Sequence, residues 1–156
     1  MRLLPLLAAI FFPLVASAGE VKFSPAEIEE CEKQPGDPRY CIGLAMEICW
    51  AETHEGYSQE NMAACGWAEA EYWQSRLDTV FAAHGNNATR DMFQRFIASW
   101  EDARSARCEL FSARADETNA HQGGLAGCMI YSTAEEVLYQ EQQLRGLKPK
   151  IALQPR

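Results

Sequence analysis

The chain has 156 residues, with 22 acidic and 14 basic side chains that give a net charge of −8 near neutral pH. This acidic balance argues against binding to nucleic acid or to anionic lipid surfaces, whose phosphate groups attract basic proteins. It favours cationic partners instead.

The first 18 residues, MRLLPLLAAIFFPLVASA, have the pattern of a secretory signal peptide. A positive charge at Arg2 is followed by an apolar run over 3–15, which is too short to span a bilayer, and by the cleavage pattern Ala16-Ser17-Ala18. We expect cleavage before Gly19, which is not a lipoprotein cysteine, and no membrane span in the later sequence. The mature chain, without Arg2, would carry a net charge of −9 and be periplasmic or secreted.

All six cysteines follow the predicted cleavage site, and their number is even. In an exported chain this indicates three disulfides formed in an oxidising compartment. A zinc site is a weaker interpretation, because the chain has no C-x-x-C motif and its three histidines are neither close nor spaced as a helical pair. We therefore expect no metal and no cofactor. The cysteines are Cys31, Cys41, Cys49, Cys65, Cys108 and Cys128.

The N-terminal half of the mature chain predicts a lead-in and two helices. Residues 19–44 form a lead-in rich in Glu, Pro and Gly, in which Pro35-Gly36-Asp37-Pro38 predicts a turn. A short helix is expected over 42–53. A longer helix is expected over 59–84, with Ser58 as its N-cap.

A central helix is expected from about 88 to 113. On a helical wheel at about 100° per residue, six apolar side chains fall in one arc roughly 120° wide. Arg104 lies in the middle of this arc, so its guanidinium either pairs with an acidic or carbonyl group or extends along its own stem to solvent. The six apolar residues are Phe93, Phe96, Ile97, Trp100, Cys108 and Phe111.

The C-terminal part predicts a loop, a helix and a tail. Residues 115–127 are polar and Gly-rich and predict a loop that can include the start of a final helix, which ends near Gly146. Residues 147–156 are expected to be a flexible tail. Since no stretch shows β-alternation, the predicted fold is all-α, a small antiparallel helical bundle stapled by disulfides.

Four groups of residues resemble the lysozyme inhibitor LprI-like N-terminal domain family. The helical domain that we assign to this resemblance covers residues 45–146. The resemblance implies a small, helical, exported bacterial domain with cysteine pairs, named for a member that inhibits lysozyme. The chain departs from the family pattern at Gln74, Asp78 and Glu136, where the family usually has Asp, Asn and Arg. The matching groups are Cys49 with Ser58–Cys65, Leu77–Phe81, the W-x-x-x-R-x-x-x-C of Trp100, Arg104 and Cys108, and Gly123-Gly124 with Cys128 and Thr133.

No enzymatic motif stands out in the sequence. His54-Glu55 lacks the second histidine of a zincin, and no G-x-S-x-G or phosphate-binding glycine loop is present. Acidic pairs such as Glu135-Glu136 have the residue types of a glycosidase, but such pairs are more often a solvated surface. We therefore expect a binding protein rather than an enzyme.

Two binding functions remain open. Inhibition of a cationic hydrolase such as lysozyme would require an acidic surface and a protruding loop, for which 115–127 offers Asp116, Glu117, Asn119 and His121. The alternative is an envelope structural or interaction module with an unknown protein partner and no inhibitory activity. In that case the same segment is an ordinary exposed connection.

The disulfide pairing that we predict is Cys31–Cys41, Cys49–Cys65 and Cys108–Cys128. Each bond closes a short loop across a turn signal and would stabilise the fold by roughly 2–4 kcal/mol. The main alternative is Cys65–Cys108, because these residues lie at similar heights in a hairpin that turns near Asn86.

A buried ion pair between Arg104 and Glu69 is also predicted. Both residues lie in the apolar arcs of neighbouring helices, and they are nearly equidistant from a turn at about residue 86. Together with Trp100 they are the residues to which we assign a structural role. An unpaired charge in such a position would be strongly destabilising.

Overall fold

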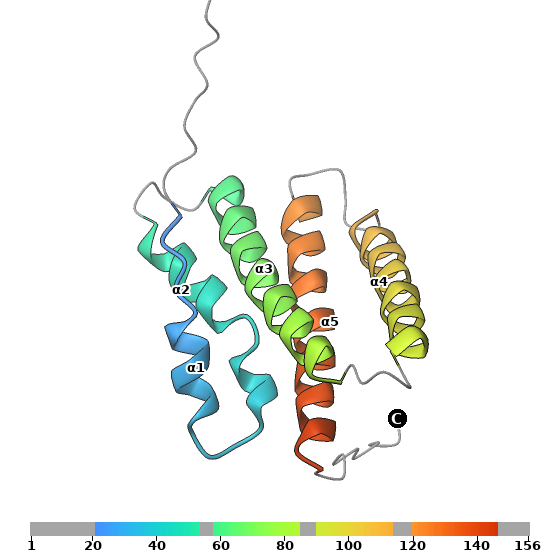
Figure 1. Cartoon of the computed structure of the whole chain (residues 1–156). Helices are drawn as coiled ribbons and strands as arrows, with labels where there is room; N and C mark the ends of the chain where they lie inside the picture. The colour runs from blue at the N-terminus through green and yellow to red at the C-terminus, as the bar shows by residue number, and fades with distance from the viewer. Residues whose placement is uncertain (1–20, 54–57, 85–89, 114–119, 147–156) are drawn as a thin grey trace, which may run out of the picture.

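A computed structural model of the chain describes residues 21–53, 58–84, 90–113 and 120–146 (Figure 1). All regular elements in these ranges are helices, which confirms the predicted all-α class. None of the helices in these ranges is long and apolar enough to cross a membrane. The elements are α1 (Ala26–Glu32), the 3-10 helix η1 (Pro38–Cys41), α2 (Leu44–Glu52), α3 (Gln59–His84), α4 (Arg90–Ala113) and α5 (Ala120–Leu144).

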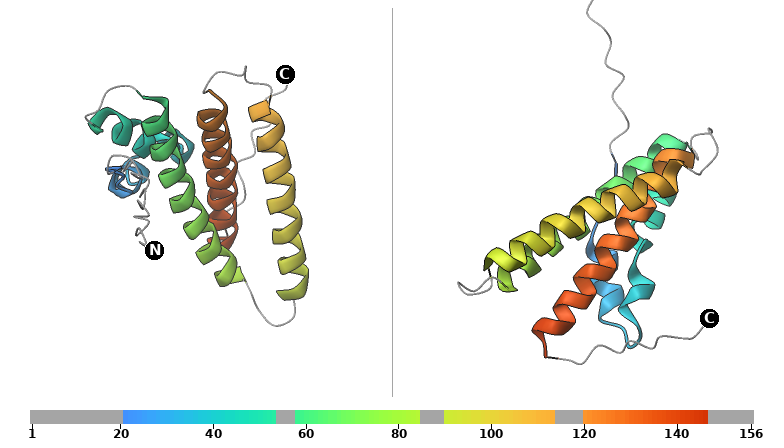
Figure 2. Two further views of the ribbon diagram at one scale, coloured as in Figure 1. Left: turned by 90° about the horizontal axis from the view of Figure 1, so that it is seen from above. Right: turned by 90° about the vertical axis from the view of Figure 1, so that its right-hand side faces the viewer.

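The three long helices form an up-down-up bundle (Figures 1 and 2). α3 and α5 pack against each other, and α4 packs mainly against α5. α1, η1 and α2 lie on the side of α3 that faces away from α4. α2 contacts α3, while η1 also reaches α5. The bundle is therefore covered by the N-terminal segment on one side and ends with α4 on the other.

The core is centred on the interface between α3 and α5. Trp73 and Leu77 of α3, one helical turn apart, are fully buried together with Ile130 and Val137 of α5. Burying an apolar side chain of this size stabilises a fold by roughly 1.5–3 kcal/mol. Ile28 of α1 is fully buried in the same cluster. The N-terminal segment is thus part of the core.

The N-terminal lead-in is more helical than we predicted. The expected turn at 35–38 is present, but α1 precedes it and η1 follows it. The Asp37 carboxylate caps η1 by accepting a hydrogen bond of 3.0 Å from the Arg39 backbone N–H. Proline signals identified the turn, whereas the seven-residue helix α1 is too short to show a clear period in the sequence.

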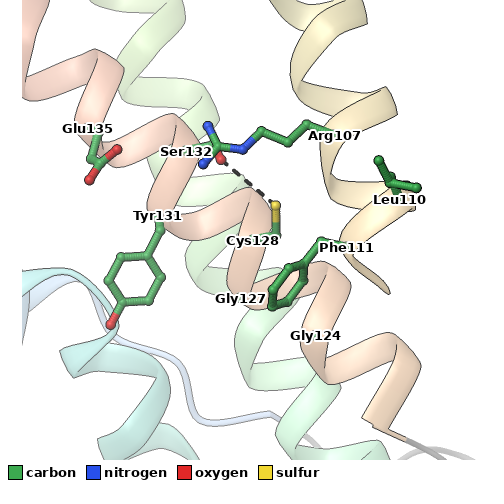
Figure 3. A pocket seen from close by; sticks show the side chains of 9 residues that line it. All are labelled: Arg107, Leu110, Phe111, Gly124, Gly127, Cys128, Tyr131, Ser132 and Glu135. Carbon is green, nitrogen blue, oxygen red and sulfur yellow. Dashed lines mark hydrogen bonds between the residues drawn. The ribbon is translucent and has the colours of Figure 1, made fainter. Parts of the chain in front are cut away.

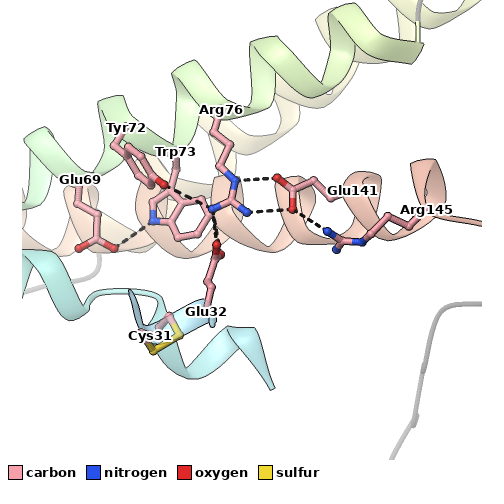
Figure 4. Close-up of polar contacts among 9 residues, drawn as sticks. Cys31, Glu32, Glu69, Tyr72, Trp73, Arg76, Glu141 and Arg145 are labelled. Atoms are coloured by element: carbon pink, nitrogen blue, oxygen red, sulfur yellow. Dashed lines mark hydrogen bonds and ion pairs between the residues drawn. A yellow bond between two sulfur atoms is a disulfide. The ribbon is translucent and has the colours of Figure 1, made fainter. Parts of the chain in front are cut away.

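Arg76 of α3 ties the N-terminal segment to the bundle (Figure 4). Its Nη1 donates to both carboxylate oxygens of Glu32 in α1 at 2.9 Å, and its Nε donates to Oε1 of Glu141 in α5 at 2.7 Å. The guanidinium carbon also lies 5.0 Å from the centre of the Trp73 ring. Burial alone would lower the pKa of Arg76, but the bonds to Glu141 and Glu32 outweigh it and raise this pKa. Arg76 therefore stays charged and joins three helices.

The three predicted disulfides are confirmed. The sulfur–sulfur distance is 2.00 Å in Cys31–Cys41, 2.04 Å in Cys49–Cys65 and 2.05 Å in Cys108–Cys128. The alternative Cys65–Cys108 bridge is wrong. Each bond joins two cysteines that are consecutive in the sequence. The loop between them is short, so closing it costs little conformational entropy.

The predicted pairing of Glu69 with Arg104 is wrong. Glu69 is fully buried, and its carboxylate accepts hydrogen bonds from the backbone N–H groups of Gly43 and Met46, each at 2.7 Å. It also accepts a 3.0 Å bond from the indole nitrogen of Trp73. The negative charge therefore lies at the N-terminus of α2, where the helix dipole favours it, and needs no arginine.

The helix boundaries follow the predictions closely, and one correction concerns the core-facing arc of the central helix. The Ser58 hydroxyl accepts a 3.1 Å hydrogen bond from the backbone N–H of Asn61, which confirms the predicted cap of α3. Residues 120–127 form the start of α5, as the prediction for the Gly-rich segment allowed. Phe96 and Phe111, which we placed in the core-facing arc of the central helix, are both exposed. The arc was too wide because α4 is covered mainly by one neighbour, α5.

Two glycines in the long helices have opposite surroundings. A Cβ atom added to Gly66 would lie 3.0 Å from the Cβ of Ala126 and 3.4 Å from the sulfur of Met46. The lack of a side chain at Gly66 therefore lets α3 and α5 approach closely. A Cβ atom at Gly127 would have no atom within 4 Å. Packing explains the first glycine and leaves the second unexplained, although each costs a helix about 1 kcal/mol relative to alanine.

These surroundings predict opposite effects of the same substitution. Gly66→Ala should lower the free energy of unfolding by about 1–3 kcal/mol, because the added methyl group forces α3 and α5 apart. Gly127→Ala should raise it by up to about 1 kcal/mol, since the helix gains propensity without a clash. Urea titrations of both variants, followed by circular dichroism, will measure the two effects. Equal stabilisation by both substitutions would contradict the close helix contact.

Candidate binding groove

An open groove of about 590 Å³ lies between the C-terminal half of α4 and the N-terminal half of α5 (Figure 3). Its volume is in the range of pockets that bind small molecules or side chains of a partner. One wall comes from α4 and the other wall and the floor come from α5. The lining residues are Arg107, Leu110 and Phe111 of α4, and Gly124, Gly127, Cys128, Tyr131, Ser132 and Glu135 of α5.

The groove owes its depth to glycine and its apolar character to three large side chains. Phe111 lies over Gly124, with a ring carbon 3.9 Å from where a Cβ of that residue would be. Gly127, which packing leaves unexplained, lies open to the groove. Leu110, Phe111 and Tyr131 remain 57%, 60% and 51% exposed. Apolar side chains this exposed around one hollow are typical of a site for a partner.

The polar groups of the groove are few and diverse. Arg107 has no hydrogen-bond or ion-pair partner among the residues that the structure describes. The Ser132 hydroxyl lies 3.9 Å from each sulfur of the Cys108–Cys128 disulfide, which crosses the base of the groove. Glu135 is exposed at one end. A guanidinium with no partner among the described residues, beside an apolar surface, suits recognition of a partner with an accessible acceptor group.

The groove rests on a rigid framework built from the W-x-x-x-R-x-x-x-C pattern. Cys108 of α4 is bonded to Cys128 of α5. One turn earlier, Nη1 of Arg104 donates to Oγ1 of Thr133 in α5 at 2.7 Å and to Oε1 of Gln74 in α3 at 2.6 Å. The guanidinium carbon of Arg104 lies 4.7 Å from the centre of the Trp100 ring. Two successive turns of α4 are thereby fixed to α5.

The environment of Arg104 explains why this position carries arginine. Burial lowers the pKa of its guanidinium, while the carboxylates of Glu101 and Asp78 oppose that effect. Its direct partners are neutral groups, not the carboxylate that we expected. Gln74, one of the positions at which the chain departs from the pattern that it resembles, supplies the acceptor for Arg104. This hydrogen bond is made to a neutral amide oxygen and connects α4 to α3.

The predicted contact residues are next to the groove in the sequence, but most lie outside the described residues. Asp116, Glu117 and Asn119 belong to the connection between α4 and α5, whose placement the structure does not describe. His121 lies in the first turn of α5, and its side chain is also outside the described part. The connection begins three residues after Phe111, which lines the groove.

The groove itself was missed by sequence reasoning. Phe111 was assigned to the core, and Leu110 and Tyr131 were not singled out. One signal was available, because Gly124 and Gly127 are three residues apart and therefore lie on the same side of a helix. Two glycines on one helical face predict a close approach or a hollow.

The chemistry of the groove is that of a binding site. Its lining offers one carboxylate, one guanidinium and two hydroxyl groups, and no histidine or free thiol. Elsewhere in the described part of the chain, no group of three His, Cys, Asp or Glu side chains is arranged to hold a metal ion. Fold and site therefore define a small, disulfide-bonded helical domain suited to binding a partner.

Comparison with known families agrees with this class and specifies it. Residues 49–146, well over half of the chain, match the family described as lysozyme inhibitor LprI, and the protein belongs to that family. The chain is also similar to an uncharacterized 17.7 kDa protein in the puhA 5' region of Rhodobacter capsulatus. The two are 27% identical over 165 residues, covering 92% of this chain and 96% of the relative. No solved structure matches the chain.

Proposed function

We propose that the mature protein is an exported envelope protein that binds and inhibits a lysozyme-like cationic hydrolase. The observation that carries the proposal is the open apolar groove in a chain of the LprI family, which is described by lysozyme inhibition. The predicted signal peptide would deliver the protein to the compartment where such hydrolases act.

The groove and the acidic segment that follows α4 in the sequence have complementary roles in this proposal. Leu110, Phe111 and Tyr131 provide apolar surface that a partner can bury, and buried apolar anchors supply most of the energy of a protein interface. Asp116 and Glu117, which follow the end of α4 by three and four residues in the sequence, are the acidic groups that we propose to attract a basic partner. The net charge of −9 expected for the mature chain attracts a basic enzyme from a distance.

Salt should weaken inhibition through this long-range attraction. The screening length falls from about 10 Å at 0.1 M salt to about 3 Å at 1 M, so the association rate with a basic hydrolase should decrease steadily. Lysis of cell-wall suspensions by several lysozymes, measured with the mature protein at increasing salt, will show this. Replacing Asp116, Glu117 and His121 together by alanine should weaken inhibition further at low salt. Absence of inhibition of every lysozyme at micromolar protein and low salt would contradict the proposal.

A variant that fills the groove separates groove binding from general attraction. Gly127→Leu places an isobutyl group in open space and favours the helix, so the fold should be retained. We expect inhibition to become at least about tenfold weaker, equivalent to about 1.4 kcal/mol. Ala82→Leu adds the same group to an exposed position of α3 and is the control. Unchanged inhibition by Gly127→Leu would place the contact elsewhere.

The alternative function is an envelope interaction module without inhibitory activity. Arg107 favours it, because a cationic side chain in the groove suits an acidic group on some other protein better than a basic hydrolase. Lysis assays distinguish the two, since such a module leaves every lysozyme active.

A further inference from the structure

The outer face of α4 carries a second apolar surface that is distinct from its packed face. Met92, Phe96 and Leu110 are 62%, 43% and 57% exposed. At about 100° per residue these side chains lie within about 40° of one another, although they span most of the helix. Three small exposed residues, Ser99, Ala103 and Ala106, lie along the same face, and the exposed Arg107 borders it beside Phe96. The three large and three small residues are here called the α4 outer face.

The packed face of α4 is accounted for by other residues. Ile97, Arg104 and Cys108 point toward α5 and α3, where they pack, donate hydrogen bonds or form a disulfide. The α4 outer face is centred about 120° around the helix from these residues, and Leu110 lies where it meets the rim of the groove. Figure 2 shows α4 at the edge of the bundle, with no other described helix beyond it. A single exposed apolar residue is ordinary, but three aligned along one helix indicate an interaction surface.

The distribution of large and small residues on this face is symmetric about position 101. The large Met92 and Leu110 are each nine residues from that position, and the small Ser99 and Ala103 are each two residues from it. A twofold axis at this point would place an antiparallel α4 of a second copy against the same face. Each Phe96 would then lie at the same height along the contact as the small Ala106 of the other copy. Small side chains at the centre permit the close approach at which two helices pack well.

The charges on one flank of this face are complementary in the same arrangement. Arg95 and Glu109 lie on the same side of the α4 outer face, and neither has a partner in the described part of the chain. They are 14 residues apart, about 21 Å along the helix, and so cannot pair within one copy. In an antiparallel pair the same flanks meet, which brings each Arg95 to the Glu109 of the other copy.

We propose that the protein forms a twofold-symmetric dimer through antiparallel contact of the α4 outer faces. A second copy of the chain fits this face. The apolar residues of one copy can pack on those of the other, and Arg95 of each copy can pair with Glu109 of the other. Asp102 lies near the axis and would face its own counterpart, and both copies are acidic. This repulsion predicts that added salt favours the dimer, the opposite of its effect on hydrolase inhibition.

Sedimentation velocity of the mature protein, from low micromolar to several hundred micromolar, tests the dimer. We expect a concentration-dependent shift from monomer to dimer that is stronger at high salt. Ala103→Glu should abolish the shift by placing two carboxylates at the centre of the contact. Its thermal unfolding at low concentration should equal that of the natural chain, because Ala103 is exposed in the monomer. A monomer at every concentration, or dimerisation unaffected by Ala103→Glu, would overturn the proposal.

Charge reversal tests the antiparallel arrangement. Arg95→Glu and Glu109→Arg should each raise the dissociation constant at least about tenfold, because each places like charges opposite one another twice. The double variant should restore dimerisation, since the charges are exchanged between copies. The control is Glu71→Arg, which reverses a charge at an exposed position of α3 outside the proposed contact. It should leave the dissociation constant unchanged without any compensating substitution. Failure of the double variant to exceed the singles would rule out this pairing.

Discussion

Replacing Arg76 by methionine should lower the free energy of unfolding by about 3–5 kcal/mol, the usual cost of removing one member of a buried ionic group. The side chains of Arg76, Glu32 and Glu141 are only 20%, 19% and 17% exposed. Methionine matches the length of the arginine stem but leaves the Glu32 carboxylate without its cation and Glu141 with only Arg145, at 3.7 Å. The loss should therefore exceed that of a single hydrogen bond.

Chemical denaturation at neutral pH will measure this effect. The control is Lys33→Met, which removes the 3.0 Å ion pair with Glu30 at the surface. Because both of these side chains are largely exposed, the control should leave the unfolding midpoint almost unchanged. Similar midpoints for the two variants would mean that water replaces Arg76 without cost and that α1 is not held by it.

Replacing Glu69 by glutamine should cost about 3 kcal/mol, although the two side chains have nearly the same shape. The carboxylate accepts three hydrogen bonds, from Gly43, Met46 and Trp73, and is fully buried. A glutamine offers one acceptor oxygen and turns an amide N–H group toward a backbone donor. Hydrogen bonds to a charged group contribute about 1.5–3 kcal/mol each, and a buried donor without an acceptor adds a penalty.

Hydrogen exchange can locate the effect of the Glu69 substitution as well as its size. The amide of Met46, which donates to Glu69, should exchange faster in the variant because the N-terminus of α2 loses its cap. Glu71→Gln, two residues along α3 and exposed, should leave both stability and exchange at Met46 unchanged. Faster exchange throughout the protein without a local difference at α2 would argue against a capping role.

Local sequence patterns allowed the helices of this protein to be predicted more accurately than the contacts between distant residues. The boundaries of α3 and the cap at Ser58 follow from the turn signals and apolar period at those positions. The three disulfides were predictable because each closes a short loop at a turn. These inferences depend on residues that are close in the chain, where geometry leaves few alternatives.

The partners of buried polar groups were much harder to predict. Counting residues from an assumed turn placed Glu69 beside Arg104, but height alone does not specify which way a side chain points around a helix. The donors to Glu69 are mostly backbone groups of Gly43 and Met46, which no sequence pattern marks. The groove was missed for a related reason, since the exposure of Phe111 depends on how far α5 covers α4.

The stretch that matches the family and the stretch that folds around one core are different in this protein, because the N-terminal segment is part of the core. The stretch that identifies the family begins at residue 49, yet Ile28 completes the core and Glu32 neutralises Arg76. A fragment cut at that boundary would keep every family motif and lose part of the interior that supports them. The unit recognised by homology is thus shorter than the unit that folds, and domain boundaries for this protein are better drawn from its buried contacts than from its alignment.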